Sequence, residues 1–227
     1  MLNIQSLHKS YNHGKEQGVI ALKGISLNIR AGEFVSIMGP SGSGKSSLLQ
    51  ICGGLDRPTS GEVTFNNVQI HKLSDLELSL FRRRQLGFVF QFFNLLPLMN
   101  AVENICLPLL LDGRSLSQVE GRALKLLEMM DLKKRAYHKP HEMSGGELQR
   151  VAIARALITK PLLILADEPT GNLDSKSGVI VLNLLKEISQ SQNQAILMVT
   201  HDRNAANFGS RIVHLRDGVV ETDEKVN

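Results

Sequence analysis

The sequence predicts an α/β fold built on a mostly parallel sheet. Short apolar runs of strand length recur along the chain, and one of them leads through a glycine-rich motif into an apolar helical segment. Strands buried on both faces of a parallel sheet appear in sequence as continuous apolar runs. We expect such strands near residues 34–38, 87–90, 162–166, 195–200 and 211–215.

Length and composition indicate a globular protein without a membrane span. The chain has 227 residues, of which 42% are hydrophobic and 21% charged, enough to build a sizeable core. No apolar run approaches the roughly 20 residues that a membrane helix requires, and the start lacks a signal-peptide layout. The two cysteines, Cys52 and Cys106, have neither the number nor the spacing of a disulfide or metal framework, so we expect both to be buried.

Two further segments complete the predicted organisation. Residues 1–33 contain alternating stretches, such as Val19–Ile29, that suit an antiparallel sheet. Residues 92–157 are predicted to be a helical insertion. Within it Ser117 and Glu120 have the spacing of a capping box, and apolar residues then recur at helical intervals as a core-facing stripe, at Val119, Ala123, Leu127 and Met130.

The glycine-rich motif is a phosphate-binding loop. Residues 39–46, Gly-Pro-Ser-Gly-Ser-Gly-Lys-Ser, follow the strand at 34–38 and precede a helix, the order that a P-loop NTPase core requires. Backbone N–H groups of such a loop surround phosphates at a helix N-terminus. Lys45 is expected to reach the β- and γ-phosphates and the Ser46 hydroxyl to ligate Mg²⁺. The predicted ATP-binding set is Gly39, Pro40, Ser41, Gly42, Ser43, Gly44, Lys45, Ser46 and Ser47.

Two adjacent acids end the strand at 162–166. Successive side chains of a strand point to opposite faces, so Asp167 and Glu168 are expected to have different tasks. Phosphoryl transfer needs a metal-holding acid and a group that orients the attacking water. We therefore expect Asp167 to face the Mg²⁺ ion and Glu168 to act on the water.

A second anion-seeking helix end begins at Ser144. Ser144 and Glu147 have the spacing of a capping box opening a helix over 148–158, and that reading alone leaves Gly145 and Gly146 unexplained. Two glycines in a first helical turn cost up to roughly 1 kcal/mol each relative to alanine. A capped helix end stripped of side chains can approach an anion. Because the chain already has a phosphate loop, the second end suggests a composite site completed by another protomer.

Together these motifs resemble the ATPase subunit of an ABC transporter over nearly the whole chain. The resemblance implies that Tyr11 stacks on adenine, that Gln91 touches Mg²⁺ or the water, that Asp174 acts across the dimer, and that His201 contacts the γ-phosphate. Each also has a plain reading when taken alone. A single tyrosine is more often packing, and polar residues at strand ends are usually structural or solvated.

Finer features resemble the lipoprotein-releasing, macrolide-exporting and cell-division group of bacterial ATPases. They are the stretches 87–97, 103–109 and 168–174. The signature departs from that group at Met143, where leucine is usual, and at Leu148, which replaces a common glutamine. Neither change touches the helix-end N–H groups.

The resemblance implies an ATP-hydrolysing subunit that binds ATP and Mg²⁺ and forms a head-to-tail homodimer around ATP. It implies separately encoded transmembrane permease subunits as partners, and peripheral attachment at the cytoplasmic face of the inner membrane. Residues 1–91 and 158–227 would form the nucleotide-binding core with its β subdomain. Residues 92–157 would form a helical subdomain carrying the signature.

Two other functions remain open at the level of sequence. Such an assembly could relay ATP-driven motion across the membrane without moving a substrate, because substrate choice would lie in the partner. A soluble ABC-type ATPase acting on DNA or ribosomes is a different class. The net charge is +4, with basic runs at 82–84 and 133–135. Aromatic residues make up only 4% and do not interleave with these runs, so nucleic acid is not expected as a partner.

Overall fold

A six-stranded sheet forms the centre of the computed structural model, which describes residues 1–11 and 18–226. Its strand order is β10-β9-β3-β8-β7-β6. Five strands are parallel: β3 (Phe34–Met38), β6 (Leu86–Phe90), β7 (Leu163–Asp167), β8 (Ala195–Thr200) and β9 (Arg211–Arg216). These are the five predicted strands, with ends shifted by at most one residue. The mostly parallel core is thereby confirmed.

A second sheet has the order β2-β1-β4-β5 and is antiparallel, as predicted for the N-terminal part of the chain. Its strands are β1 (Leu2–Tyr11), β2 (Val19–Ile29), β4 (Ser60–Phe65) and β5 (Val68–Gln69). Sequence analysis missed β4, β5 and the antiparallel edge strand β10 (Val219–Lys225). All three are short or polar, and most of β10 is exposed, so they lack the apolar run used to find the others.

Alternating side chains of the central strands divide the interior into two cores. In β7, Leu163 and Leu165 face the core shared with the antiparallel sheet and α1 (Lys45–Cys52). Ile164 and Ala166 face the core shared with the helices of the other side. All four are fully buried, which explains why this strand appears in sequence as an unbroken apolar run.

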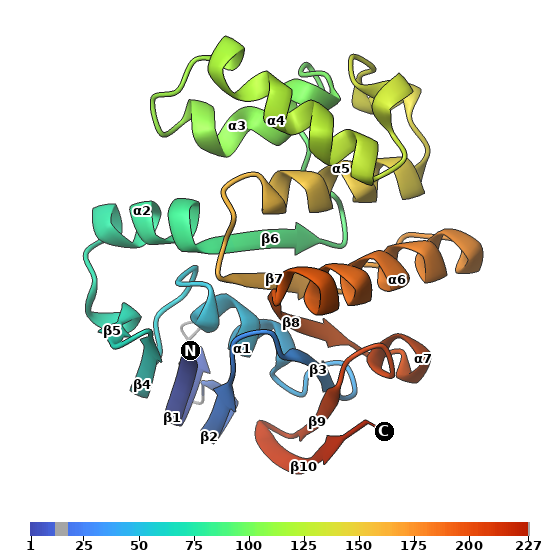
Figure 1. The fold of residues 1–227 in the computed structure, drawn as a ribbon. Coiled ribbons are helices and arrows are strands. Elements are labelled where there is room, and N and C mark those ends of the chain that lie inside the picture. The colour runs from blue at the N-terminus through green and yellow to red at the C-terminus, as the bar shows by residue number, and fades with distance from the viewer. Residues whose placement is uncertain (12–17, 227) are drawn as a thin grey trace.

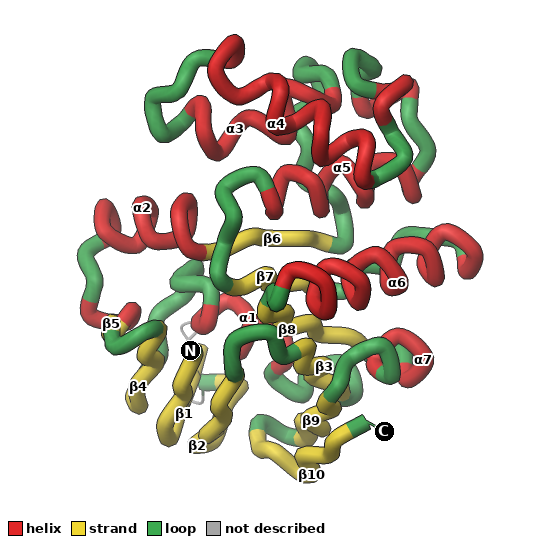
Figure 2. The backbone as a smooth tube through the Cα atoms, viewed as in Figure 1, coloured by secondary structure: helices red, strands yellow, loops and turns green. Residues whose placement is uncertain are grey.

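The remaining helices cover the opposite face and the β6 end of the sheet. They are α2 (Asp75–Gln85), α3 (Ala101–Leu110), α4 (Leu116–Met129), α5 (Gly145–Leu157), α6 (Ser175–Gln192) and α7 (Arg203–Ala206), with short 3₁₀ turns η1 (Ile70–Lys72), η2 (Lys133–Arg135) and η3 (Pro140–Glu142). Figure 1 shows α3, α4 and α5 gathered beyond β6, while α6 crosses the sheet. In Figure 2 this helical group lies on the β6 side of the central sheet, with α5 next to β6.

The start of α4 differs from the prediction. The capping residues are Ser115 and Gln118 rather than Ser117 and Glu120. The N–H of Ser115 donates to Gln118 Oε1 at 2.9 Å, whereas the Ser117 hydroxyl contacts the Ser115 hydroxyl at 3.1 Å. Glutamine caps as glutamate does, and it lets the helix begin two residues earlier. The predicted core stripe on this helix is confirmed, since its four members are buried.

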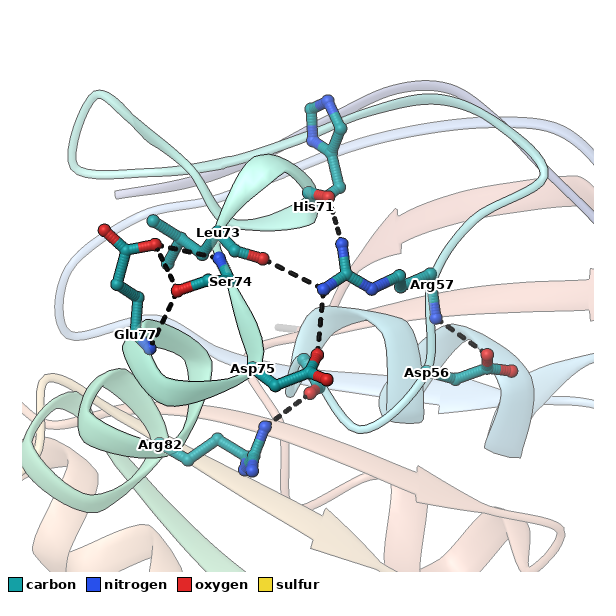
Figure 3. Close-up of polar contacts among 9 residues, drawn as sticks. Asp56, Arg57, His71, Leu73, Ser74, Asp75, Glu77 and Arg82 are labelled. Atoms are coloured by element: carbon teal, nitrogen blue, oxygen red, sulfur yellow. Dashed lines mark hydrogen bonds and ion pairs between the residues drawn. The ribbon is translucent and has the colours of Figure 1, made fainter.

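Polar clusters hold the segments on either side of β6. Arg57, after α1, donates to the carbonyl oxygens of His71 and Leu73 and pairs with Asp75 at 3.0 Å (Figure 3). This contact joins the loop after α1 to the first turn of α2. At the other end of α2, Arg83 and Arg84 both pair with Asp112, just beyond α3. Ion pairs therefore fix the position of α2 at both of its ends.

Asn104 of α3 holds the loop that follows β6. The residue is fully buried. Its Oδ1 accepts from the N–H of Leu96 at 2.7 Å, and its Nδ2 lies within 3.1 Å of the carbonyl oxygens of Leu96, Met99 and Asn100. This one side chain gives the N–H of Leu96 its acceptor and joins the loop to the start of α3.

Replacing Asn104 by leucine should destabilise the protein. Asn104→Leu keeps the side-chain volume but leaves the N–H of Leu96 without its acceptor, which should lower the free energy of unfolding by about 1–3 kcal/mol. Urea denaturation followed by circular dichroism measures this loss. Asn183→Leu, on an exposed position of α6, is the matched control and should stay within about 0.5 kcal/mol of the parent protein. Equal stability of both variants would contradict this role of Asn104.

Candidate active site

The phosphate loop joins β3 to the N-terminus of α1. Gly44 is the N-cap of α1 with φ +101°, a left-handed conformation that favours glycine. A Cβ at Gly39 would lie 2.1 Å from the carbonyl oxygen of Leu215, so that position has no room for a side chain. By contrast, a Cβ at Gly42 would meet nothing within 4 Å. The loop therefore presses against the sheet at Gly39 and faces open space at Gly42.

Lys45 occupies the centre of this loop and is buried. Its Nζ donates to the carbonyl oxygens of Gly39 and Pro40, each at 2.8 Å. Burial lowers the pKa of Lys45, while the negative charges of Glu168 and Asp167 act to raise it. The ammonium group thus lies over the loop and close to both acids, as a cation for the phosphate groups would have to be.

A cavity of about 770 Å³ opens over the loop. It brings together ten of the predicted site residues, Tyr11, Pro40, Ser41, Gly42, Gly44, Lys45, Ser46, Ser47, Glu168 and His201. Two members of the motif, Gly39 and Ser43, are not part of its wall. Ser43 is buried beneath the loop, where the described residues give its hydroxyl no hydrogen-bond partner. Strand, loop and helix from three separate parts of the chain converge on this cavity.

Glu168 and His201 form a pair on the cavity wall. Glu168 Oε1 lies 2.9 Å from His201 Nδ1. Strand β7 ends at Asp167, and Glu168 has φ +43°, so the expected alternation of strand side chains does not extend to Glu168. The turn is held by two hydrogen bonds, from the N–H of Glu168 to the oxygen of Val199 and from the N–H of Gly171 to the oxygen of Glu168, both 3.0 Å. Glu168 therefore owes its direction to a left-handed turn.

Asp167 lies at the end of β7, between the ends of β6 and β8. Burial raises the pKa of Asp167, and the nearby charge of Glu168 raises it further, against the opposing effect of Lys45. A bound cation would relieve this crowding of negative charge. Across the described ranges, no three His, Cys, Asp or Glu side chains gather as a metal site. A metal here would have to be shared with hydroxyl, amide and phosphate oxygens, which suits Mg²⁺.

Gln91 does not line the cavity. Its side-chain Nε2 donates to Asn172 Oδ1 at 3.3 Å, and Asn172 Nδ2 donates to the backbone oxygen of Gln91 at 3.0 Å. A Cβ at Gly171 would lie 2.7 Å from Gln91 Nε2, so the glycine makes room for this contact. Sequence analysis missed Asn172, because an asparagine in a turn carries no signal of a distant partner.

Tyr11 is fixed by a polar network that sequence analysis also missed. Its hydroxyl lies 2.9 Å from Asp56 Oδ2 and 3.2 Å from Ser47 Oγ. Lys9 pairs with Asp56 at 2.7 Å, and its Nζ lies 4.7 Å from the centre of the Tyr11 ring. Burial is the main cause of the raised pKa of Tyr11. The network places the ring at the edge of the phosphate cavity.

The signature segment opens α5 with the predicted capping box. The N–H of Ser144 donates to Glu147 Oε2 at 2.7 Å, and the N–H of Glu147 donates to Ser144 Oγ at 3.3 Å. Glu147 also pairs with Arg135 at 3.0 Å. Part of the glycine requirement has a local cause, because a Cβ at Gly146 would lie 3.0 Å from Ser177 Oγ. At Gly145 the nearest atom is an ordinary 3.4 Å away, in Leu173.

Asp174 caps another helix in the structure. Its Oδ1 accepts from the N–H of Ser177 at 3.0 Å and thereby begins α6. A hydrogen bond with the Ser177 side chain, together with the one from the Ser177 N–H, lowers the pKa of Asp174. Neither Asp174 nor the segment 144–147 lines the phosphate cavity. The chain thus has a phosphate loop and, apart from it, a second helix end whose Gly145 is not crowded by its own chain.

Two sequence expectations about the whole chain can be compared with the structure. Both cysteines are buried, as predicted, and burial raises the pKa of Cys52 to about 12. Across the part of the chain that the structure describes, no helix has the length and apolar character of a membrane span.

Comparisons with known proteins agree with this architecture. The family model described as ABC transporter matches residues 22–171. An ABC transporter ATP-binding protein of Methanocaldococcus jannaschii, MJ0796, is 51% identical over 100% of this chain and 97% of its own length. A lipoprotein-releasing system ATP-binding protein, LolD, of Legionella pneumophila is 47% identical, with 96% of each chain covered.

Two further likenesses extend this result. A macrolide export ATP-binding/permease protein, MacB, of Bdellovibrio bacteriovorus is 46% identical over 100% of this chain and 34% of its own length. A solved dimeric structure of MJ0796, in a post-hydrolysis state with ADP and Pi, matches with a TM-score of 0.91 and 49% identity over 100% of this chain and 99% of that one. With the family matched over most of its length and its relatives over all of it, the chain belongs to the ABC transporter family and is one of its ATP-hydrolysing cassettes.

Proposed function

We propose that this chain powers a membrane transporter of the export or lipoprotein-extracting type by hydrolysing ATP between two copies of itself. The observation that carries the proposal is that the phosphate loop and the Glu168–His201 pair line the same cavity. The names of LolD and MacB support the direction of transport, because one relative is named for lipoprotein release and the other for macrolide export.

Binding of ATP would use the loop and the tyrosine. The N–H groups at the start of α1 and the ammonium of Lys45 would surround the β- and γ-phosphates. To do so Lys45 exchanges two carbonyl oxygens for phosphate oxygens. The Tyr11 ring would stack on the base, held in place by Asp56. Gly42, whose missing side chain leaves open space, gives the phosphates room to approach the backbone.

Mg²⁺ fits this site because Ser46 and Asp167 are oxygen donors at the end of the loop and of β7. When bound, the ion neutralises charge on the phosphates during transfer. Asp167 would hold it from the sheet and Ser46 from the helix. Gln91 would join them after releasing Asn172, since the structure places its side chain outside the cavity.

Hydrolysis would depend on the pair at the cavity wall. Glu168 would orient the attacking water, and His201 would hold the carboxylate through Nδ1 while its other nitrogen reaches the γ-phosphate. The left-handed turn at Glu168 points the carboxylate toward the loop instead of along the strand. Hydrolysis also requires that bulk water be excluded from the site, and the open cavity of a single chain does not exclude it.

A second protomer would complete the site. Each ATP would be held by the loop of one chain and by residues 144–147 of the other, with Asp174 at the same contact. The dimeric relative with ADP and Pi supports this arrangement. ATP would join the protomers because the γ-phosphate is the anion that both helix ends share.

The permease would bind in a groove between α2, β6 and the helices above them. This groove of about 370 Å³ is lined by apolar residues, including Phe88, Leu107, Leu111 and Ala156, and by three arginines, Arg82, Arg83 and Arg155. It lies between the proposed core, 1–91 and 158–227, and the proposed helical subdomain, 92–157. A partner bound there would contact both the core and the helical subdomain, so it would move when one shifts relative to the other. The chain would then lie at the cytoplasmic face of the inner membrane.

Of the alternatives, signalling without transport would use the same residues and differ only in the partner. Binding of nucleic acid has less support. Two of the three arginines at 82–84 pair with Asp112, so this basic run is partly neutralised by its own chain. The run at 133–135 is likewise engaged, through Lys133 with Glu128 and Arg135 with Glu147.

Removing the Glu168 carboxylate should stop hydrolysis while sparing binding. Glu168→Gln should lower ATP turnover by about 10²-fold or more, because an amide cannot accept the proton of the attacking water. Phosphate release measures turnover, and a fluorescent nucleotide measures affinity. Glu187→Gln, at an exposed position of α6, removes the same charge and should leave turnover unchanged. Near-normal turnover of Glu168→Gln would remove this residue from the proposed role.

The composite site should make dimerisation depend on ATP and on Gly145. Glu168→Gln protein with ATP and Mg²⁺ should elute as a dimer in size exclusion, and with ADP mainly as a monomer. Adding Gly145→Asp places a negative charge against the shared phosphate and should abolish the dimer while leaving nucleotide binding intact. Gly121→Asp is the matched control, since a side chain there meets nothing within 4 Å. A Gly145→Asp dimer as stable as the control dimer would refute the head-to-tail arrangement.

A charge in the groove should separate the chain from its permease. Leu111 is 63% exposed, so Leu111→Glu should fold normally and keep its basal ATPase rate. Its co-purification with the co-expressed permease should fall by about tenfold or more, because docking would have to remove water from a charged carboxylate that stands where the parent chain offers an apolar side chain. Val68→Glu, on the exposed β5 of the other sheet, is the control. Equal recovery of permease with both variants would place the docking surface elsewhere.

A further inference from the structure

A buried carboxamide in α5 connects the two chain segments that carry Gln91 and Glu168. The Gln149 side chain is fully buried. Its Nε2 donates to the carbonyl oxygen of Pro169 at 2.6 Å and to that of Phe90 at 3.3 Å. Phe90 immediately precedes Gln91, and Pro169 immediately follows Glu168. One NH₂ group therefore uses both of its protons to join the ends of β6 and β7 to the signature helix.

The orientation of this amide is set by its neighbours. If it were reversed, its oxygen would face two carbonyl oxygens, which cannot donate. In the present orientation Oε1 is buried, and residues 1–11 and 18–226 offer it no hydrogen-bond partner. An unsatisfied buried acceptor destabilises a fold, so packing alone would be better served by an apolar side chain. What distinguishes glutamine here is the pair of hydrogen bonds that it donates.

The segment held by Gln149 needs such support. Glu168 has φ +43°, a conformation that residues with side chains rarely adopt and that persists only where surrounding contacts fix it. Pro169 has no N–H, so its carbonyl oxygen is the only backbone hydrogen-bonding group that it can offer. The contact at 2.6 Å uses this group. Gln149 therefore fixes the turn that sets the direction of the Glu168 carboxylate.

Gln149 also lies close to the signature. It follows Gly145 by four residues, about one turn of the same rigid helix, so the two move together. We infer that Gln149 is a positioning residue, which transmits the placement of residues 144–147 to Glu168 and Gln91. A partner that engages the signature thereby aligns the groups that act on the water. The inference rests on the roles proposed above for Gln91 and Glu168.

The first test separates positioning from stability. Gln149→Met keeps the length and burial of the side chain and removes the donor, so kcat should fall by about 10- to 100-fold while the Kd for ATP stays within about twofold. Ile153→Val is the control, because it loosens a buried position of α5 and removes no hydrogen bond. At matched losses of Tm, only the Gln149 variant should lose kcat. If Gln149→Met folds poorly, Gln149→Asn is tested in its place. Its side chain is too short to reach both oxygens, so the same loss of kcat is expected.

The second test asks whether Gln149 acts through Glu168. In single-turnover assays the double variant, Gln149→Met with Glu168→Gln, should lose much less than the product of the two separate losses, because both changes disable the same carboxylate and only the placement of Gln91 is left for Gln149 to affect. A double variant that shows the product of the two separate losses would overturn the inference, as would a folded Gln149→Met with normal kcat. Near-normal turnover of Glu168→Gln would overturn the proposed role of Glu168 and this inference with it. A slow Glu168→Gln beside a fast Gln149→Met overturns the inference alone.

Discussion

The carboxyl edge of the parallel sheet is the constraint on which the rest of the structure depends. Strand β3 leads into the phosphate loop, β6 and β8 end one residue before Gln91 and His201, and β7 ends at Asp167. Parallel pairing in register brings these ends to one edge, so the phosphate loop and His201, which are far apart in sequence, line one cavity. The apolar runs that bury both faces of the strands thereby also determine where the chemistry takes place.

Sequence predicts this edge well because its signals are local and repetitive. A buried strand needs an unbroken apolar run, and a phosphate loop needs glycines at fixed spacing, so both can be recognised without knowing the fold. The same reasoning fails for Glu168. Period-two alternation describes a strand, and the chain leaves the strand at Asp167. It also misplaced the start of α4, because Gln118 caps as glutamate would and the spacing rule alone cannot choose between two serines.

The rest could not be predicted because it depends on partners far apart in sequence. Asn172 meets Gln91 across 81 residues, and Gln149 meets Pro169 across 20 and Phe90 across 59. Nothing near Asn172 or Gln149 in sequence distinguishes them from solvated polar residues. Their importance comes from burial and from the backbone oxygens placed opposite them, which only the assembled layers supply. The helical layer thus contributes contacts to a site that the sheet defines.

The hydrogen bonds of Lys45 bear on what happens between catalytic cycles. With its ammonium held by the oxygens of Gly39 and Pro40, the loop has a satisfied arrangement of its own when no phosphate is near. An incoming nucleotide therefore competes with the chain for this cation, which weakens its apparent affinity. The same competition favours product release, because the carbonyl oxygens of Gly39 and Pro40 can accept from the ammonium group when the phosphate dissociates. An ATPase has to release ADP as well as bind ATP. The hydrogen bonds of Lys45 to its own loop favour that release.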